Sequence, residues 1–424
     1  MVNQKKRKLG RGVAIVGAGM SKFGVRPGVN GRELFTEAFT DMMASVDKPV
    51  DIKDIEGLWL GNCMAELWES QSAIAPICAQ WIGLTPRPAL KIEDACASSS
   101  VASRQALMGI ASGMYDVVLA GGVEKMTTLP TNETTMALAA GSDTTYEASA
   151  GFTFPGLYAS MATAYMHKYG TAIEDFMRVG IKNHNNGALN PKAHFPVSIQ
   201  DVMNGRIAKA REKGLPVPVW ADEMEFLRDP ATNPVIAWPM RLFDCSPITD
   251  GASCVLLVAE EIARDFTDNP IYIIGTGQAS DNPLHGRKTL TNVPAAEIAA
   301  RQAYDMAGVT PGDIRIAEVH DCFTIAEIMA TSDLGFFSPG EEAARAAGDG
   351  KTARDGAKPI NTSGGLKSKG HPVGASGTAQ IVEIFHQMRG GAGSRQVTMD
   401  VPLALTHNVG AHGTTCVVQI YERR

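Results

Sequence analysis

Hydrophobic runs that end in glycine turns occur at corresponding places in the two halves of the chain. Residues 13–19 and 271–277 each have the pattern of a buried β-strand followed by a tight turn. After each run, apolar positions recur at helical spacing, which predicts helices over residues 31–46 and 294–307. The same order of strand, turn and helix therefore appears twice. Such a repeat predicts a duplicated α/β architecture with internal pseudo-symmetry.

The repeat is interrupted in the middle of the chain. Between about residues 126 and 238, threonine-rich stretches, short helical patterns and many turn residues replace it, which is typical of an inserted loop or cap region. Strand-like segments resume and continue almost to the C-terminus. We therefore divide the chain into four parts: a basic arm at 1–10, a first half at 11–125 plus 239–262, the inserted loop/cap region at 126–238, and a second half at 263–424.

Composition narrows the class of protein. The 424 residues are 44% hydrophobic and 20% charged with a net charge of −6, which is ordinary for a globular protein and argues against nucleic acid as the main partner. The longest apolar runs are too short for a membrane-spanning helix. The seven cysteines form no CxxC pair and no zinc-type cluster with histidine, so we expect no metal site. Their number and placement suit a reducing, cytoplasmic location.

Cys96 is the first candidate for a catalytic group. It lies in the segment Glu-Asp-Ala-Cys-Ala-Ser-Ser-Ser, just before a predicted amphipathic helix over residues 101–110. A cysteine at a helix start meets the positive end of the helix dipole and unpaired N–H groups, and both favour the thiolate. Position alone leaves the alternative of a small buried cysteine equally open. Two histidine segments far along the chain favour the nucleophile.

Three residues of the second half complete the candidate site. His320 follows a predicted strand, His371 lies in a glycine-rich loop that opens a helix, and Asn408 lies in the segment Thr-His-Asn-Val-Gly-Ala-His-Gly. A single histidine is usually structural. Two histidines in turns, together with a cysteine at a helix start, predict an acyl-transfer site in which the imidazoles move protons to and from a sulfur nucleophile.

These segments resemble the thiolase superfamily over nearly the whole chain. The nucleophile turn, the central landmark and the Gly-His-Pro block of that family correspond to residues 94–98, 250–252 and 361–372. Residues 320–323, His-Asp-Cys-Phe, stand where the main branch carries Asn-Glu-Ala-Phe, and Asn408 stands where it carries a second cysteine. Both departures resemble the sterol-carrier-protein-2 type of thiolase. The resemblance implies an α/β fold of two pseudo-symmetric βαβ-type halves in a layered α/β/α/β/α arrangement.

The resemblance also implies a role for each matched residue. His371 takes the proton of Cys96, whose thiolate attacks a thioester or a 3-ketone. Cys322 is a second acid/base at the α-carbon or the departing thiol, in place of the cysteine that Asn408 replaces. His320 holds the thioester oxygen of the enolate. The backbone N–H groups of Cys96 and Gly410 form a second oxyanion hole.

Contacts with coenzyme A are less well defined by the sequence. The resemblance makes coenzyme A a co-substrate and implies no permanently bound cofactor. Ser246 is a candidate contact for its pantetheine arm. Arg206, Lys209 and Arg211 form a basic cluster that is either a solvated helix face, which we favour, or a set of phosphate contacts.

The implied reaction is thiolytic cleavage of a 3-oxoacyl-CoA through an acyl-Cys96 intermediate, or the reverse Claisen condensation, and the sequence does not choose the direction. The middle region is longer than usual around residues 208–235. That length suggests a bulky or aromatic substrate such as benzoylsuccinyl-CoA, which we rank equal with acetoacetyl-CoA, or a docking surface. We expect a homodimer and allow for a small zinc-ribbon/OB-fold partner subunit.

Three other functions compete with this interpretation. A decarboxylating ketoacyl synthase of the same fold also uses a Cys-His-His set, but a Gly-Thr pair is expected where Asp321 and Cys322 follow His320. A retro-aldolase of this fold dispenses with the cysteine, whereas this chain retains Cys96 and Cys322. A non-catalytic acyl-binding scaffold would keep its function after alkylation of Cys96, and an enzyme would lose it.

Overall fold

A computed structural model describes residues 8–424. Most of the predicted basic arm, residues 1–7, lies outside the described residues. None of the helices in residues 8–424 combines the length and the apolar character needed to span a bilayer.

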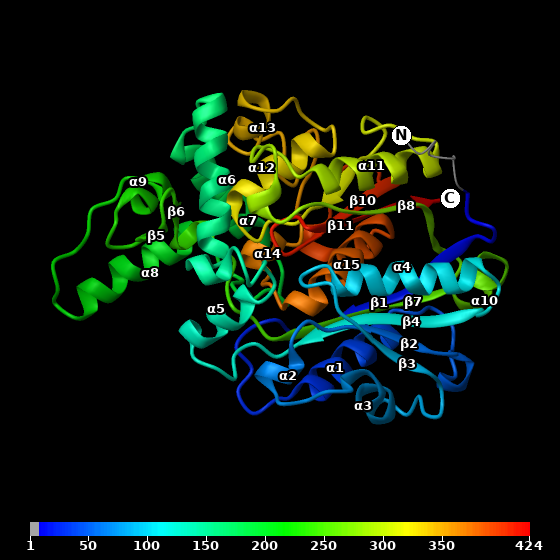
Figure 1. Ribbon diagram of the computed structural model, residues 1–424. Coiled ribbons are helices and arrows are strands. Elements are labelled where there is room, and N and C mark those ends of the chain that lie inside the picture. Colours follow the sequence, from blue (N-terminus) through cyan, green and yellow to red (C-terminus); the bar gives the residue numbers. More distant parts are fainter. Residues whose placement is uncertain (1–7) are drawn as a thin grey trace.

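Nine of the described strands form one large mixed sheet, in the order β3-β2-β4-β7-β1-β8-β11-β10-β9 (Figure 1). The first five come from the first half: β1 (Val13–Met20), β2 (Leu58–Gly61), β3 (Ala89–Ile92), β4 (Val117–Glu124) and β7 (Gly251–Ala259). The others come from the second half: β8 (Ile271–Ser280), β9 (Ile316–Glu318), β10 (Leu403–Gly410) and β11 (Thr415–Arg423). The two half-sheets join at β1 and β8, which pair over only two positions, Ala14 with Tyr272 and Ile15 with Ile271.

Two helices fill the space between the half-sheets. Helix α4 (Ser98–Ala111) packs on β2 and β4, helix α15 (Ser376–Met388) packs on β1, β7 and β10, and the two helices contact each other. On the outside, α1 (Gly31–Ala44) with α3 (Ile74–Trp81) covers the first half, and α11 (Pro294–Ala307) with α12 (Thr324–Asp333) covers the second (Figure 1). These layers confirm the α/β/α/β/α arrangement implied by the resemblance.

Local sequence signals explain where the outer helices begin and end. Asn30 caps α1 by accepting the Glu33 N–H, while the Glu33 carboxylate accepts the Asn30 N–H, so two otherwise unpaired donors are satisfied. Helix α11 has Pro294 at its first position and ends at Gly308 in the left-handed conformation. The helix predicted over 294–307 therefore has its observed bounds, and the one predicted over 31–46 ends two residues earlier.

The segment between β4 and β7 forms a largely helical region beside the sheet. Its helices α6 (Phe154–Tyr169) and α7 (Ile173–Ala188) lie against the second half, and α5 (Thr131–Ala139) contacts α6. Helices α8 and α9 and a hairpin form a lobe at the left of Figure 1. The lobe comprises α8 (Ile199–Glu212), α9 (Glu223–Arg228), β5 (Val235–Ala237) and β6 (Met240–Arg241). Four short helices complete the chain: α2 (Ala65–Trp68), α10 (Ala263–Phe266), α13 (Glu341–Arg345) and α14 (Gly365–Ser368).

Candidate active site

The nucleophile turn lies at the N-terminal end of α4. Cys96 comes two residues before the helix, after Ala95, whose φ of 49° is in the left-handed region. The Ser98 hydroxyl stabilises this turn because it donates to the Ala95 carbonyl at 2.6 Å and accepts the Asp94 N–H at 2.9 Å. Cys96 is 8% exposed and faces an internal cavity.

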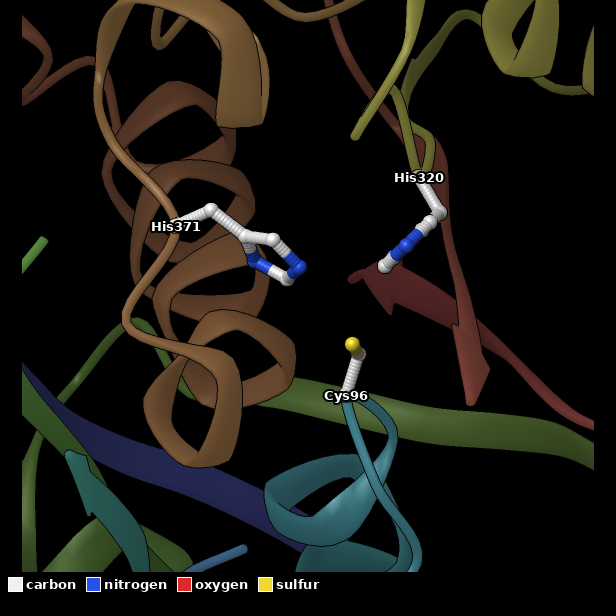
Figure 2. Close-up of side chains that lie close together, drawn as sticks. All are labelled: Cys96, His320 and His371. Atoms are coloured by element: carbon white, nitrogen blue, oxygen red, sulfur yellow. The ribbon is translucent and has the colours of Figure 1, made fainter. Parts of the chain in front are cut away.

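Close packing of α15 against α4 brings the second half to this turn. A Cβ atom at Gly377 would lie 2.5 Å from the Ser100 nitrogen, so only glycine allows the two helix starts to approach. His371 lies in the loop before α15, and His320 lies between β9 and α12. The Cys96 sulfur and one nitrogen of each imidazole all lie within 4.8 Å of one another, and both rings point towards the sulfur (Figure 2).

Hydrogen bonds define which nitrogen of His371 carries its proton. The Ser376 hydroxyl donates to the Pro372 carbonyl at 2.9 Å, so its oxygen is free to accept from His371 Nδ1 at 2.7 Å. A neutral His371 therefore carries its proton on Nδ1 and keeps a free lone pair on Nε2. Burial, reinforced by Lys369, lowers the pKa of His371 to about 3. The ring is thus a neutral base at physiological pH.

His320 has the opposite tautomer. The Ser100 hydroxyl donates to Asn408 Oδ1 at 2.9 Å, which leaves the Asn408 NH₂ group facing His320 Nδ1 at 3.0 Å. Since Nδ1 accepts, the proton of the neutral ring is on Nε2, a buried atom with no hydrogen-bond partner. Burial lowers the pKa of His320 well below its ordinary value, followed by the effects of His371 and His407. His320 therefore presents an unused N–H donor to the site.

Burial decides the charge of Cys96, contrary to the expectation from its position. Desolvation raises the pKa of the Cys96 thiol to about 12, although hydrogen bonds from the backbone N–H groups of Ala411 and of Cys96 itself oppose that rise. The expectation of a thiolate at rest is therefore wrong, because the helix start does not compensate for the loss of water. The resting site pairs a thiol with a neutral imidazole, and proton transfer accompanies nucleophilic attack.

A cavity of about 120 Å³ opens over the sulfur. Cys96, Cys322, His371 and Ser246 all lie on its wall, and the remaining lining is mostly apolar: Thr135, Leu138, Phe154, Pro155, Cys245, Ile248, Phe323, Val373 and Ala411. Burial raises the pKa of Cys322 well above the ordinary value, so this thiol also holds its proton. The Ser246 N–H donates to the Cys322 carbonyl at 2.9 Å, which ties the two segments together.

Gly410 lies directly against the nucleophile turn. A Cβ atom there would be 2.5 Å from the Asp94 carbonyl oxygen, so a larger residue would displace the turn. The next residue, Ala411, has a φ of 55° and lines the cavity. Sequence reasoning chose Gly410 and missed Ala411, because a strained backbone at an alanine leaves no signal in the sequence.

The basic cluster on α8 is not part of the cavity wall. Arg206, Lys209 and Arg211 are all exposed, and the Arg206 guanidinium lies over the Phe226 ring at 5.3 Å. These side chains therefore lie on a solvated helix face of the lobe, whereas the other candidate residues gather around the sulfur.

Two buried carboxyl groups next to the site were missed in the sequence. Glu124, at the end of β4, accepts the N–H groups of Cys63 and Gly374 at 2.8 and 2.9 Å, and burial raises its pKa to about 8. Asp321 accepts the Leu366 N–H at 2.6 Å, and burial followed by its neighbour Glu327 raises its pKa to about 7. Each connects a strand end to the loops around His371. A charged residue at the end of an apolar strand is the signal that could have revealed them.

The Cys-His-His group also contains the atom types that bind transition metals. Ligation through His320 Nε2 would need a lone pair there, and the Asn408 NH₂ group favours the tautomer in which that nitrogen is protonated. The hydrogen bonds therefore suit proton transfer better than metal binding. The expectation of a metal-free site stays a prediction.

Comparison with known proteins shows the family to which the chain belongs. The family model for the thiolase N-terminal domain matches residues 13–261, and the one described as thiolase C-terminal domain-like matches residues 277–423. The chain is similar to an acetyl-CoA acetyltransferase of Methanothermobacter thermautotrophicus, with 42% identity over 97% of this chain and 100% of that protein.

The chain is also similar to more distant proteins. Sterol carrier protein 2 of Bos taurus is 31% identical over 97% of this chain and 72% of its own length. The benzoylsuccinyl-CoA thiolase subunit BbsB of Thauera aromatica is 30% identical over 95% of this chain and 96% of its own. The solved Ltp2-ChsH2(DUF35) aldolase shares the fold, with a TM-score of 0.76, 24% identity and coverage of 97% and 98%. The chain belongs to the thiolase superfamily and is an acyltransferase of the thiolase type.

Proposed function

We propose that this protein cleaves a short 3-oxoacyl-CoA with free coenzyme A, or runs the reverse Claisen condensation, through an acyl-Cys96 intermediate, and that acetoacetyl-CoA is its preferred substrate. The small apolar cavity over Cys96 is the observation that carries this proposal. Pockets that enclose drug-sized ligands measure about 300–1,000 Å³, whereas this cavity measures about 120 Å³. Leu138, Phe154 and Ile248 narrow it to a space suited to an acetyl or acetoacetyl unit.

The long middle region no longer favours a bulky substrate. Residues 208–235 belong mainly to the lobe of α8 and α9, and none of them lines the cavity. The relative named acetyl-CoA acetyltransferase is 42% identical, and the one named for benzoylsuccinyl-CoA is 30% identical. Both facts support a short acyl group, with benzoylsuccinyl-CoA as the alternative that the experiment must exclude.

The first half-reaction forms the acyl-enzyme. His371 Nε2 takes the Cys96 proton as the sulfur attacks the 3-keto carbon of the substrate. The bond between C2 and C3 then breaks, and its electron pair becomes the enolate of acetyl-CoA. The His320 Nε2–H donates to the enolate oxygen. The Cys322 thiol gives its proton to the α-carbon, and acetyl-CoA leaves.

The second half-reaction releases the product. The Cys322 thiolate takes the proton of incoming coenzyme A, whose sulfur attacks the acyl carbon on Cys96. Backbone N–H groups of Cys96 and of the 410–411 turn stabilise the oxyanion of this step. The S–C bond to Cys96 breaks, and the protonated His371 returns its proton to the sulfur. Each group ends in its starting state, so the same steps serve the condensation in reverse.

Coenzyme A is the co-substrate in this proposal, and Ser246 on the cavity wall is the proposed contact for its pantetheine arm. The proposed contacts for the phosphates of coenzyme A are the exposed side chains on α8, Arg206, Lys209 and Arg211. Seven free cysteines support a reducing, cytoplasmic location.

We also propose a homodimer, with a small zinc-ribbon/OB-fold protein as a further partner. One relative is named a subunit, and one structural neighbour is a complex with a DUF35 protein. Light scattering of the purified protein, alone and with the product of a neighbouring gene, measures both assemblies.

A panel of thioesters tests the substrate. Thiolysis of acetoacetyl-CoA, 3-oxohexanoyl-CoA and benzoylsuccinyl-CoA is followed as loss of the 3-oxoacyl-CoA in the presence of coenzyme A. We expect the highest kcat/KM with acetoacetyl-CoA, no turnover by the Cys96→Ala variant, and a shift towards 3-oxohexanoyl-CoA in Leu138→Ala, which enlarges the cavity. A higher kcat/KM for benzoylsuccinyl-CoA, or turnover that survives loss of Cys96, would overturn the proposal.

A further inference from the structure

The turn between β10 and β11 lies against the nucleophile turn. Gly410 ends β10 beside the Asp94 carbonyl, and Ala411 lines the same cavity as Cys96, where its backbone N–H opposes the rise in the pKa of the thiol. Ala411 holds a left-handed φ of 55°, a conformation that an alanine keeps only when its surroundings enforce it. The turn therefore needs contacts from outside the hairpin to keep its shape.

One of those contacts comes from the middle region of the chain. His412 is fully buried, and its Nε2 lies 2.8 Å from Glu147 Oε2, whose side chain is 3% exposed. The other carboxylate oxygen, Oε1, accepts the His285 backbone N–H at 3.1 Å. A second contact, from the Tyr158 hydroxyl to the Ala411 carbonyl, measures 3.3 Å. Glu147 thus connects three segments that are far apart in the sequence.

The hydrogen-bond pattern assigns the charges of this pair. His412 Nδ1 is buried without a partner, so a proton there would be unsatisfied. The neutral ring with its proton on Nε2 satisfies the contact, and burial lowers the pKa of His412. Burial by itself would raise the pKa of Glu147, but hydrogen bonds from His412 and the His285 backbone reverse that effect and lower it to about 2. The contact is therefore a charge-assisted hydrogen bond between a carboxylate and a neutral imidazole.

Glu147 also belongs to the segment that shapes the cavity. It lies in the connection between α5 and α6, and these helices supply Leu138 and Phe154 to the cavity wall. The Phe154 ring lies near the His412 ring, with centroids 6.5 Å apart. A single side chain therefore joins the wall that surrounds the acyl group to the turn that faces the sulfur.

We propose that Glu147 and His412 are positioning residues, whose hydrogen bond locks the 410–413 turn to the α5–α6 connection and so holds the backbone of Gly410 and Ala411 against the Cys96 turn. The idea rests on the proposed acyl-Cys96 chemistry. Misplacing a reacting group by about 1 Å can slow catalysis about 100-fold. We therefore expect Glu147→Ala and His412→Ala each to lower kcat by about 10- to 100-fold with a much smaller change in KM.

The test uses the full-length protein and two readouts at a temperature where circular dichroism shows every variant to be folded. The first is thiolysis of acetoacetyl-CoA. The second is acetylation of Cys96 by p-nitrophenyl acetate, in which the thiol gives its proton to His371, the sulfur forms an S–acetyl bond and p-nitrophenolate leaves. One equivalent of p-nitrophenolate appears as a rapid burst. This burst depends on the nucleophile and its oxyanion donors without requiring a 3-oxoacyl-CoA. A wild-type burst without any thiolysis would contradict the proposed function and still allow the turn contact to be judged.

Matched variants separate positioning from simple stability. Glu174→Ala breaks the 3.0 Å ion pair with Arg228 in the same middle region, away from the cavity, and should leave the burst rate unchanged. Glu147→Gln keeps an acceptor for His412 and should recover most of the rate lost in Glu147→Ala. The double variant Glu147→Ala/His412→Ala should be no slower than either single variant, because both remove one contact. Burst rates at the wild-type level in both single variants, or losses that multiply in the double variant, would overturn the proposal.

Discussion

The loop that carries His371 and the turn that carries His320 each place an imidazole beside the Cys96 sulfur, but one imidazole is a base and the other is a hydrogen-bond donor. The Ser376 hydroxyl accepts a hydrogen bond from Nδ1–H of His371, which leaves the far nitrogen as a base. Asn408 donates to Nδ1 of His320, which leaves the far nitrogen as a donor. Both rings are buried and neutral, so charge does not distinguish them. The residue behind each imidazole decides whether it takes a proton or offers one.

Removal of His371 should have the largest effect. Without the base, the buried Cys96 thiol has nowhere to send its proton, and a positioned base typically contributes about 10²–10⁴-fold. In His371→Ala, both the p-nitrophenyl acetate burst and thiolysis of acetoacetyl-CoA should fall by roughly 10³-fold. His386→Ala, which removes a half-buried histidine outside the cavity, is the control. A variant that keeps its burst while losing thiolysis would assign the base to another residue.

Removal of His320 should separate the two steps. The enolate forms only when the carbon–carbon bond breaks, so His320→Ala should slow thiolysis by about 10²–10³-fold, the usual effect of losing one oxyanion donor. The burst with p-nitrophenyl acetate involves no enolate and should change far less. Stopped-flow measurement of both rates decides the matter. Equal losses of rate in thiolysis and in the burst would mean that His320 also acts in acylation, contrary to the roles that the two tautomers indicate.

Reversing the tautomer of His320 should have an intermediate effect. In Asn408→Asp, a carboxylate would accept from Nδ1, so the neutral ring would lose the proton on Nε2 and with it the donor. A hydrogen bond to a charged group is worth about 1.5–3 kcal/mol, so thiolysis should fall roughly 10- to 100-fold. Ser100→Ala leaves the Asn408 NH₂ group in place and should cost about 0.5–1.5 kcal/mol at most. Full activity in Asn408→Asp would show that the donor is dispensable.

The smallest expected effect is that of pH. Burial lowers the pKa of His371 to about 3 and raises that of Cys96 to about 12, so neither group changes charge between about pH 5 and 8. The burst rate with p-nitrophenyl acetate should therefore be level between about pH 5 and 6, below the interval in which the buried carboxyl groups of Asp321 and Glu124 lose their protons. A rate that rises several-fold from pH 5 to 6, as expected for an imidazole with the ordinary pKa of about 6.5, would show that His371 is protonated at the lower pH and not a neutral base.

Local residue patterns were sufficient to predict the layers of the fold and which residues form the candidate site. The strand at 13–19, the helix at 294–307 and the turn positions of Cys96, His320 and His371 all carry local signals, because glycine turns and helix starts act over a few residues. Helix α4 begins at Ser98, three residues before the predicted start, because the Ser98 hydroxyl closes the turn at the helix start. Such errors concern boundaries and leave the site intact.

Properties that depend on the whole fold were not predictable. The thiol state of Cys96 follows from the removal of water by both halves of the chain, and no window of sequence contains that information. The lobe is another example. The length of the middle region suggests a bulky substrate, yet residues 208–235 do not line the cavity. The contact between Glu147 and His412 joins positions 265 apart and has no local pattern.

The narrow join of the two half-sheets gives the enzyme a particular vulnerability. One half supplies the sulfur and the other supplies both imidazoles, while β1 and β8 share two residue pairs. A slip of one half against the other by an atom's width would separate nucleophile from base and leave every strand and helix folded. Catalytic activity therefore depends on the relative position of the two halves. Mild denaturant should abolish this activity before circular dichroism or fluorescence shows unfolding.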